Sequence, residues 1–540
     1  MTIDLFLKNK IFNALVSLKL DVLLDEIIIE RAKDDNHGDY ASNIALQFSK
    51  KAQLKPKELA EKIVQVINMD DLEKIEIAGP GFLNFFLKPP LFQKLISKII
   101  KLNQNYGRGL EKNFKINVEF VSANPTGDLH LGHARCAAIG DAICRLYEFA
   151  GYDVVREYYV NDAGAQIEKM GESLRVRYLN EFGRTLKMPE DGYHAYDIIK
   201  VAKTLKRLYG TKLIEDNLEN KNIFINEGVR LLLDKIIEDL KLFRVTFDLY
   251  SYESVIRQDN LIERTIEKYR PFIYVEEGAT YLKTTMHGDD KDRPIIKSDG
   301  AYTYLLPDIA YHLEKASRGY DLLIDVFGAD HHGYTKRIKS SLLMQGYPEN
   351  IIDFELVQIV RLMKGDEEVK MSKRGGTAIT LNELVGEVGV DAARYFFAAR
   401  AASSHLDFDY NLALEQNSSN PVFYAQYAHA RLSRLLEDGK HYNLDLSGSL
   451  LNAKAEINLL KHLHDFPLFI ELSAKHREPY KIANYIQKLA NLIHLFYTEC
   501  RVLDEENKLL SGARLALCKA SKIVLANALN ILGVSAPKKM

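Results

Sequence analysis

Residues 119–133 read EFVSANPTGDLHLGH, and this stretch decides how the central part of the chain folds. Before it, apolar residues alternate with polar ones in KINVEF (115–120), which predicts a strand. After it, LGHARCAAIGDAICRLYEFAG (131–151) predicts a helix capped near Gly151. A turn between a strand and a helix is where such sheets bind nucleotides, because the first helical turn offers unpaired N–H groups to phosphate.

Three further strand-like segments follow along the chain, separated by helical patterns. They are YDVVREYYV (152–160), DLLIDVF (321–327) and ELVQIVRL (355–362). This alternation predicts a doubly wound parallel sheet over residues 113–413, with a helix-rich insert at about 170–290. Residues 1–112 mix both patterns and predict an α+β domain, whereas residues 414–540 predict an all-α bundle. The predicted fold class is therefore α/β, with a Rossmann-like central domain.

The composition excludes several classes of protein. No uncharged apolar run reaches the ~18 residues that cross a bilayer, and charges interrupt the first 15 residues, so neither a membrane span nor a signal peptide is expected. The four cysteines are scattered without a CxxC pair, which favours a reducing cytoplasm and argues against a zinc site. The net charge of −2 means that binding RNA requires a local basic patch. Residues 414–540 hold 16 Lys and Arg against 12 Asp and Glu, which weakly favours that segment.

Two histidines at the start of the predicted helix are candidates for chemistry on phosphate. His130 and His133 lie three residues apart and so share one face of the first turn. Two imidazole donors there can stabilise charge that develops on a phosphate under attack. Gly132 carries no side chain, which lets an adenine or ribose approach the backbone. The alternative is a pair of surface histidines beside a turn.

A second candidate is the basic stretch VKMSKRGG (369–376), which follows the strand ending at 362 through an acidic loop. Lys370 and Lys373 on a loop flanked by glycine can clamp a triphosphate, with the strongest interaction in the transition state. Taken alone, the stretch is more typical of an ordinary solvated basic loop.

Together, HLGH (130–133) and KMSKR (370–374) resemble the paired HIGH and KMSKS motifs of class I aminoacyl-tRNA synthetases, in the same order and about 240 residues apart. Further segments sharpen the resemblance to arginyl-tRNA synthetase over nearly the whole chain. They are HGDYASNIAL (37–46), AGPGFLNF (78–85), SANPTGDLHLGHAR (122–135), DAARYFFAAR (391–400), HLDFDY (405–410), NPVFYAQYAHAR (420–431) and ILGVSAPKKM (531–540). The second motif departs from the family pattern by ending in Arg374, and FDLYSYES (247–254) lacks a tryptophan that the family often has.

The resemblance implies an ATP-dependent enzyme with two steps. L-arginine and ATP, the latter with Mg²⁺, would give arginyl-adenylate and pyrophosphate, and arginine would then pass to the 3′-terminal adenosine of tRNA(Arg). Residues 1–112 would contact tRNA, residues 113–413 would carry catalysis, and residues 414–540 would bind the anticodon. The family likeness further implies a cytoplasmic monomer without zinc or another protein-ligated metal, and often a need for tRNA in the first step.

The resemblance also implies roles for individual residues. The catalytic residues would be His130, His133, Lys370 and Lys373. ATP would be bound by Gly132, Asp330, His331, Met371 and Ser372. Arginine would be bound by Glu119, Ser122, Asn124, Tyr304 and Asp308, since guanidinium pairs bidentately with carboxylates. The tRNA contacts would include Asn36, Tyr40, Tyr424, Gln426, Tyr427 and Arg431.

Structural roles remain open for many of these residues. Asp308 follows Pro307 where any helix N-terminus favours an acid, Tyr304 could pack, and Glu119 could be a solvated carboxylate at a strand edge. The tyrosines at 424 and 427 have the helical spacing of core residues, and residues 36–40 could form a plain turn at Gly38. The adjacent residues 330–332 could hold a metal, although no distant fourth ligand accompanies them.

Three other functions compete with the main interpretation. The first is a class I synthetase for another amino acid, which would need a different pocket. The second is a small-molecule nucleotidylyltransferase, which also uses an HxGH turn but needs no helical C-terminal region. The third is a non-catalytic RNA-binding relative, against which the intact histidines and lysines speak.

Overall fold

The computed structural model describes residues 3–32, 37–258, 260–369 and 379–540 of the chain. The chain divides into two compact units. Unit 1 comprises Met1–Asn103, Leu435–His464 and Leu495–Ser521, and unit 2 comprises Gln104–Arg434, Asp465–His494 and Lys522–Met540. Across the described residues, no helix is both long and apolar enough to cross a membrane.

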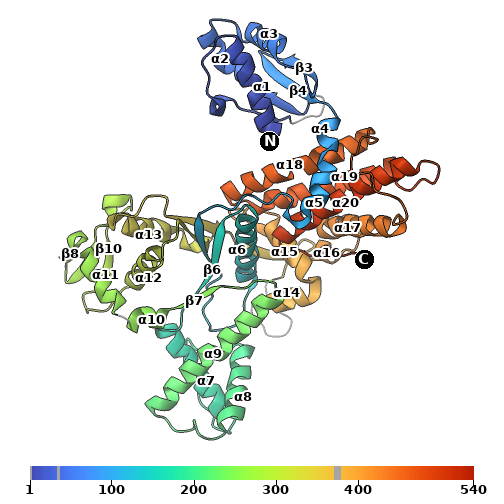
Figure 1. The fold of residues 1–540 in the computed structure, drawn as a ribbon. Helices are drawn as coiled ribbons and strands as arrows, with labels where there is room; N and C mark the ends of the chain where they lie inside the picture. Colours follow the sequence, from blue (N-terminus) through green and yellow to red (C-terminus); the bar gives the residue numbers. More distant parts are fainter. Residues whose placement is uncertain (1–2, 33–36, 259, 370–378) are drawn as a thin grey trace. The chain divides into compact units, whose positions relative to one another are not determined.

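A five-stranded parallel sheet forms the centre of unit 2, as the sequence predicts (Figure 1). Its order is β12-β11-β5-β6-β7, built from Ile352–Val357, Leu322–Gly328, Lys115–Phe120, Asp153–Val160 and Leu249–Tyr252. Five of the six residues of β5 are buried, because helices cover both faces of a doubly wound sheet. The chain runs outward from β5 to β6 and β7, then returns to β11 and β12 on the other side. The topological switch point therefore lies between β5 and β11, where ligands bind in such sheets.

Helix α6 (Leu131–Phe149) connects β5 to β6 and packs closely on the sheet. A Cβ atom on Gly140 would lie 2.4 Å from the ring of Phe120, so glycine permits this close approach of helix and strand. The helix is followed by Gly151 at φ +91°, the left-handed residue that the sequence predicts near its C-terminus.

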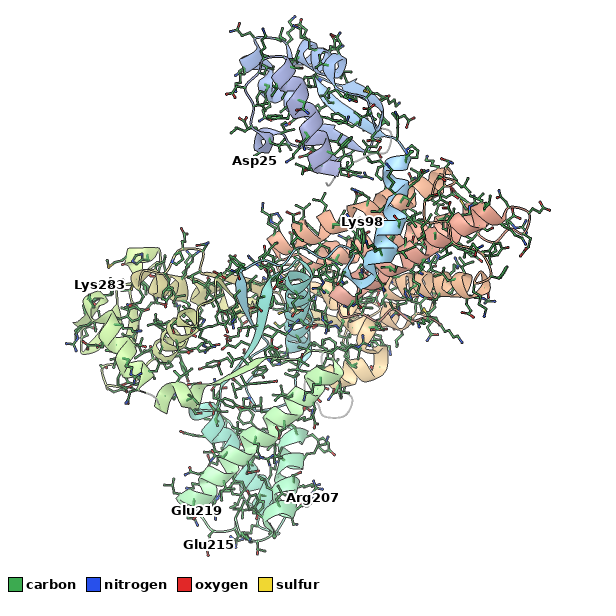
Figure 2. All side chains as sticks on the ribbon, viewed as in Figure 1. Asp25, Lys98, Arg207, Glu215, Glu219 and Lys283 are labelled. Carbon is green, nitrogen blue, oxygen red and sulfur yellow. The ribbon has the colours of Figure 1, made fainter. Side chains whose placement is uncertain are left out.

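Two helix-rich segments interrupt the sheet. Between β6 and β7, the helices α7 (Ala165–Asn180), α8 (Tyr196–Tyr209) and α9 (Leu218–Leu242) pack on one another around their own apolar core. Figure 2 shows Arg207, Glu215 and Glu219 at the far end of this three-helix group. Between β7 and β11 lie α10 (Glu253–Gln258), α11 (Leu261–Tyr269), a small antiparallel sheet and α12 (Leu305–Ser317). The small sheet pairs β8 (Ile273–Glu276), β9 (Ala279–Leu282) and β10 (Arg293–Ile296).

The prediction of a single strand at residues 355–362 is wrong, because this segment contains parts of two strands that belong to different sheets. β12 ends at Val357, and β13 (Val360–Lys364) joins β14 (Glu367–Glu368) and β15 (Leu406–Asp409). At the break, the Gln358 amide donates to Ala402, and its carbonyl accepts from the buried guanidinium of Arg135. These bonds satisfy the backbone where the chain leaves the main sheet. The neighbouring helices are α13 (His332–Met344), α14 (Leu381–Val388), α15 (Val390–Ala398) and α16 (Tyr410–Leu414).

Residues 414–540 are described throughout and contain no strand, so the predicted all-α character is confirmed. Their long helices are α17 (Pro421–Asp438), α18 (Lys454–His476), α19 (Pro479–Glu499) and α20 (Lys508–Ile531). Each of these helices contributes residues to both units.

Unit 1 contains the predicted N-terminal α+β fold. Its antiparallel sheet has the order β1-β2-β4-β3, from Glu30–Arg31, Tyr40–Ser42, Phe82–Leu87 and Leu72–Ala78. The helices are α1 (Ile3–Ser17), α2 (Ile44–Ala52), α3 (Pro56–Val66), α4 (Pro90–Gln93) and α5 (Leu95–Leu102). Asp39 is buried, accepts from the Leu87 amide and pairs with Lys461 at 2.5 Å, so an ion pair within the unit joins the N-terminal fold to α18.

Candidate active site

A pocket of about 1200 Å³ opens in unit 2 at the switch point of the sheet. Its walls come from the end of β5 and the following loop, the start of α6, the start of α12, the end of β11 and the β12–β13 connection. Most predicted site residues that the structure describes in this unit line it together. They are Glu119, Ser122, Asn124, His130, Gly132, His133, Tyr304, Asp308 and Asp330.

The chain leaves β5 through two residues in the left-handed region. Val121 has φ +69° and Ser122 has φ +39°, and this conformation is strained for a β-branched residue such as valine. The Ser122 hydroxyl donates to Glu119 at 3.1 Å and accepts from the Tyr159 amide at 3.1 Å. Ser122 therefore ties the turn to the neighbouring strand. Asn124 follows and donates to Gln166 at 2.7 Å.

His130 and His133 form a reciprocal cap at the start of α6. His130 Nδ1 accepts from the backbone amides of Gly132 and His133 at 3.1 and 3.4 Å, and His133 Nδ1 accepts from the His130 amide at 3.4 Å. The rings stack with centroids 3.7 Å apart. A Cβ atom on Gly132 would lie 2.9 Å from His130 Cε1, so glycine leaves room for the ring. The two histidines therefore cap the helix, and their role in chemistry on phosphate stays a prediction.

The cap assigns the protonation state of both rings. A nitrogen that accepts an N–H bond carries no proton, so each Nδ1 is bare and each Nε2 carries the hydrogen. Burial and the neighbouring ring lower the pKa of His133 to about 3, and burial lowers the pKa of His130. Both imidazoles are therefore neutral near pH 7, and each offers one Nε2–H donor.

Acidic side chains also line the pocket. Asp308 lies in the first turn of α12, and Glu119 lies near the end of β5 with only 4% of its surface exposed. The alternative of a solvated strand-edge carboxylate at Glu119 is therefore wrong, because β5 is central in the sheet. Tyr304, the N-cap residue of α12, is 80% exposed, which excludes a role as a core packing residue.

Sequence reasoning missed a further pocket carboxylate, Glu253 at the start of α10. Glu253 is buried, and its carboxylate accepts a hydrogen bond from Arg257 at 2.9 Å. It also accepts from Asn161 at 2.9 Å when the side-chain amide of Asn161 is turned with its nitrogen toward Glu253. Because an isolated acid in FDLYSYES carries no pattern, only the position of β7 beside β6 brings it to the pocket.

The described residues nearest to the basic stretch 369–376 line the same pocket. Val369 and Ile379 both line it. Just beyond, Thr380 pairs with His130 in an isolated bridge, and the Leu381 amide donates to Leu129 at 2.7 Å. Lys370, Met371, Ser372 and Lys373 themselves lie outside the described residues, so their roles stay predictions.

The segment after β11 lies on the pocket as predicted, with Asp330 in the short 3-10 turn Ala329–His331. The side chain of His331 lies outside the described part of the structure. Among described residues, no group of three or more His, Cys, Asp or Glu side chains is arranged to hold a metal ion. The four cysteines are buried with free thiols, and burial raises the pKa of Cys136 to about 12.

The predicted tRNA-contacting residues of α17 belong to an aromatic cluster in unit 2. We call Phe423, Tyr424, Tyr427, Arg431 and His494 the aromatic patch. The Tyr427 ring stacks with Phe423 at 6.2 Å and with His494 at 5.9 Å, and the Arg431 guanidinium lies 4.7 Å from its centre. Tyr427 is 41% exposed, so the alternative of a core role, which its helical spacing suggested, is wrong. Phe423 and His494 were missed by the sequence analysis, His494 because it comes from α19.

Two other predicted tRNA contacts occupy structural positions. Gln426 is buried, and its amide donates to Asp391 at 2.8 Å and to the Ser535 carbonyl at 3.0 Å. In unit 1, Tyr40 is buried on β2, with the Arg31 guanidinium 5.2 Å from its ring centre. Asn36 lies outside the described residues, and Gly38 has φ +86°, as expected for a turn. The tRNA roles of all three stay predictions.

Three family models match the chain in succession. They are the arginyl tRNA synthetase N terminal domain over residues 5–87, the catalytic domain of tRNA synthetases class I (R) over residues 95–432, and the DALR anticodon binding domain over residues 425–540. The second match alone spans more than half of the chain. This chain belongs to the arginyl-tRNA synthetase family.

Relatives of this family match almost end to end. The arginine–tRNA ligases of Bacillus velezensis and Bacillus subtilis are both 46% identical over 527 residues, covering 96% of this chain and 95% of each relative. A structure assigned as an arginyl-tRNA synthetase from Campylobacter jejuni is 32% identical with a TM-score of 0.78, covering 84% of this chain and all of that one. Thermus thermophilus arginyl-tRNA synthetase, at 22% identity and a TM-score of 0.77, covers 99% of both chains and shows the shared fold.

Proposed function

We propose that this chain is an arginine–tRNA ligase that activates L-arginine with ATP and transfers it to the 3′-terminal adenosine of tRNA(Arg). The observation that carries the proposal is one pocket lined by two groups of side chains, which we call the histidine wall (His130 and His133) and the acidic wall (Glu119, Asp308 and Glu253). One wall has two neutral histidine donors at a helix N-terminus, and the other has three carboxylates. Such a pocket places an anionic phosphate and a cationic guanidinium side by side. The family membership supports the same reaction.

The histidine wall suits the first chemical step. The arginine carboxylate attacks the α-phosphate of ATP, and pyrophosphate leaves. His130 and His133 donate through Nε2–H to the α-phosphate oxygens as charge develops there, and they need no proton transfer to do so. Gly132 and Asp330 would bind the nucleotide together with His331. Lys370 and Lys373, with Met371 and Ser372 beside them, would neutralise the leaving pyrophosphate, with Mg²⁺ accompanying ATP.

The acidic wall suits recognition of arginine. Asp308, Glu119 and the Tyr304 hydroxyl would receive the guanidinium, with Glu253 as a further carboxylate within the same pocket. Ser122 and Asn124 would hold the α-amino end. A fixed guanidinium fork pairs with carboxylates in two places at once, whereas a lysine ammonium does not.

The aromatic patch suits contact with unpaired bases of the tRNA. Exposed rings flanked by a guanidinium bind single-stranded bases by stacking, and each stacked base is worth ~1–3 kcal/mol. We assign this role to Tyr424, Tyr427 and Arg431, together with Phe423 and His494. The predicted domain boundaries, a cytoplasmic location and a monomeric state are likewise part of the proposal.

ATP–pyrophosphate exchange with each of the twenty amino acids, with and without total tRNA, tests the function. We expect exchange with arginine alone, and only when tRNA is present. Exchange with another amino acid would retain the class I chemistry and overturn the arginine pocket. No exchange by a folded sample would favour a non-catalytic relative. Exchange without tRNA would contradict only the expected dependence on tRNA.

A further inference from the structure

Three buried carboxylates stand in one row across the central sheet. Asp325 of β11 is in register with Glu119 of β5, which is in register with Glu157 of β6. Side chains in register on neighbouring parallel strands point to the same face. Asp325 and Glu157 have no exposed surface, and Glu119 has 4%. We call these three residues the acidic row.

Helix α12 and its C-cap residue Arg318 supply the groups that neutralise the acidic row. Lys315 Nζ donates to Glu119 at 2.8 Å and to Asp325 at 2.6 Å, and Arg318 donates to Glu157 at 2.8 Å. Like charges on neighbouring strands repel strongly in a buried site, so the row requires these cations. Burial alone would lower the pKa of Lys315, but Asp325 and Glu119 raise it above its ordinary value, which keeps the lysine charged.

The row also reaches Asp308, the carboxylate proposed to bind arginine. His312 Nε2 lies 2.8 Å from the Asp325 carboxylate, and Nδ1 lies 2.8 Å from the Asp308 backbone carbonyl and 3.1 Å from the Asp308 carboxylate. Burial alone would lower the pKa of His312, but Asp308 and Asp325 raise it well above the ordinary value. The imidazolium therefore bridges two carboxylates, one in the pocket wall and one beneath it.

Two of the proposed arginine carboxylates are thus fixed through one residue. Lys315 links Asp325 to Glu119, and His312 links Asp325 to Asp308. Asp325 does not line the pocket and cannot touch arginine itself. We propose that Asp325 is a positioning residue for arginine, which sets the separation and orientation of the Glu119 and Asp308 carboxylates through these two cations. The inference rests on the proposed recognition of arginine by the acidic wall.

The variant Asp325→Asn tests the proposal, because it keeps the shape and removes the charge. Exchange kinetics in the presence of tRNA would give separate KM values for arginine and ATP. We expect the KM for arginine to rise about 10-fold or more, because small misplacement of binding groups is costly, while the KM for ATP stays within about two-fold. Lys315→Met should show the same split, with a larger loss of stability because it leaves two carboxylates unpaired.

Asp141→Asn is the matched control. Asp141 is 1% exposed, pairs with Arg394 at 2.5 Å, and lies on α6 outside the pocket lining. It should lower the melting temperature as a buried charge loss does, without changing either KM. An unchanged KM for arginine in folded Asp325→Asn, or an equal rise of both KM values, would overturn the positioning role. If Lys315→Met fails to fold, Asp325→Asn alone decides. Failure of the wild type to exchange with arginine would instead overturn the proposed function.

Discussion

The pocket and the aromatic patch belong to the same unit but are built from different interactions. In the pocket, several charged or polar groups are held by partners, as His130 is by the amides of α6 and Asp308 is by His312. In the aromatic patch, the rings are partly exposed and touch one another mainly through their faces. The difference teaches that a small charged ligand needs groups fixed in advance, whereas bases that stack tolerate a simpler surface.

The largest effect should come from removing a histidine donor. We expect His133→Ala to lower kcat for exchange by about 10²–10³-fold, as loss of one preorganised donor does, with the KM for arginine little changed. His441→Ala, a change at an exposed histidine in unit 1, is the control. A changed KM with an unchanged kcat would show that His133 only binds the substrate. That result would contradict the proposal that His133 stabilises the transition state.

Loss of a pocket carboxylate should come next. Asp308→Asn removes one charge-assisted partner of the guanidinium, so we expect kcat/KM for arginine to fall by roughly 100-fold, with the KM for ATP unchanged. Glu349→Gln makes the same chemical change at a carboxylate that is 82% exposed, and it should change neither constant. A normal KM for arginine in Asp308→Asn would contradict recognition by the acidic wall.

A substitution in the aromatic patch should change the KM for tRNA and leave the KM for arginine unchanged. Tyr427→Ala removes one stacking surface, so the KM for tRNA in aminoacylation should rise by about 10-fold while the KM for arginine stays constant. Tyr196→Ala, at a tyrosine that is 65% exposed on α8, serves as the control. If Tyr427→Ala and its control give equal KM values for tRNA, the contrast between the two regions fails.

A last effect, on stability and not on kinetics, is the pH dependence due to His312. Its pKa is raised in the folded state, so the folded protein binds more protons than the unfolded chain above pH ~6.5. The stability from His312 is complete below that pH and is lost as the pH rises through the folded pKa, by up to ~1.4 kcal/mol per unit. Urea unfolding of wild type and His312→Gln at pH 6.5, 7.5 and 8.5 should give a difference that shrinks with pH. A constant difference would mean that His312 is neutral in the fold.

The sequence sufficed for the parts of the molecule that depend on local pattern. The stretch 119–133 predicted strand, turn and helix, and the order of strands predicted a parallel sheet with an all-α end. It did not suffice for groups that meet only through strand register. Asp325 and Glu157 are single acids inside apolar strands, and nothing local shows that they stand beside Glu119. The break at Gln358 was missed for the same reason, since its hydrogen-bond partners, Ala402 and Arg135, are distant in sequence.

The most direct test of the acidic wall compares arginine with citrulline in tRNA-dependent exchange. Citrulline has almost the same shape as arginine, but a neutral urea replaces the guanidinium. Because the wall holds Asp308, Glu119 and Glu253, a neutral side chain would lose the charge-assisted pairing that a guanidinium makes with carboxylates. We predict that kcat/KM for citrulline lies at least about 10³-fold below that for arginine. Exchange with citrulline at a comparable rate would contradict recognition by charge and leave only shape to select the amino acid.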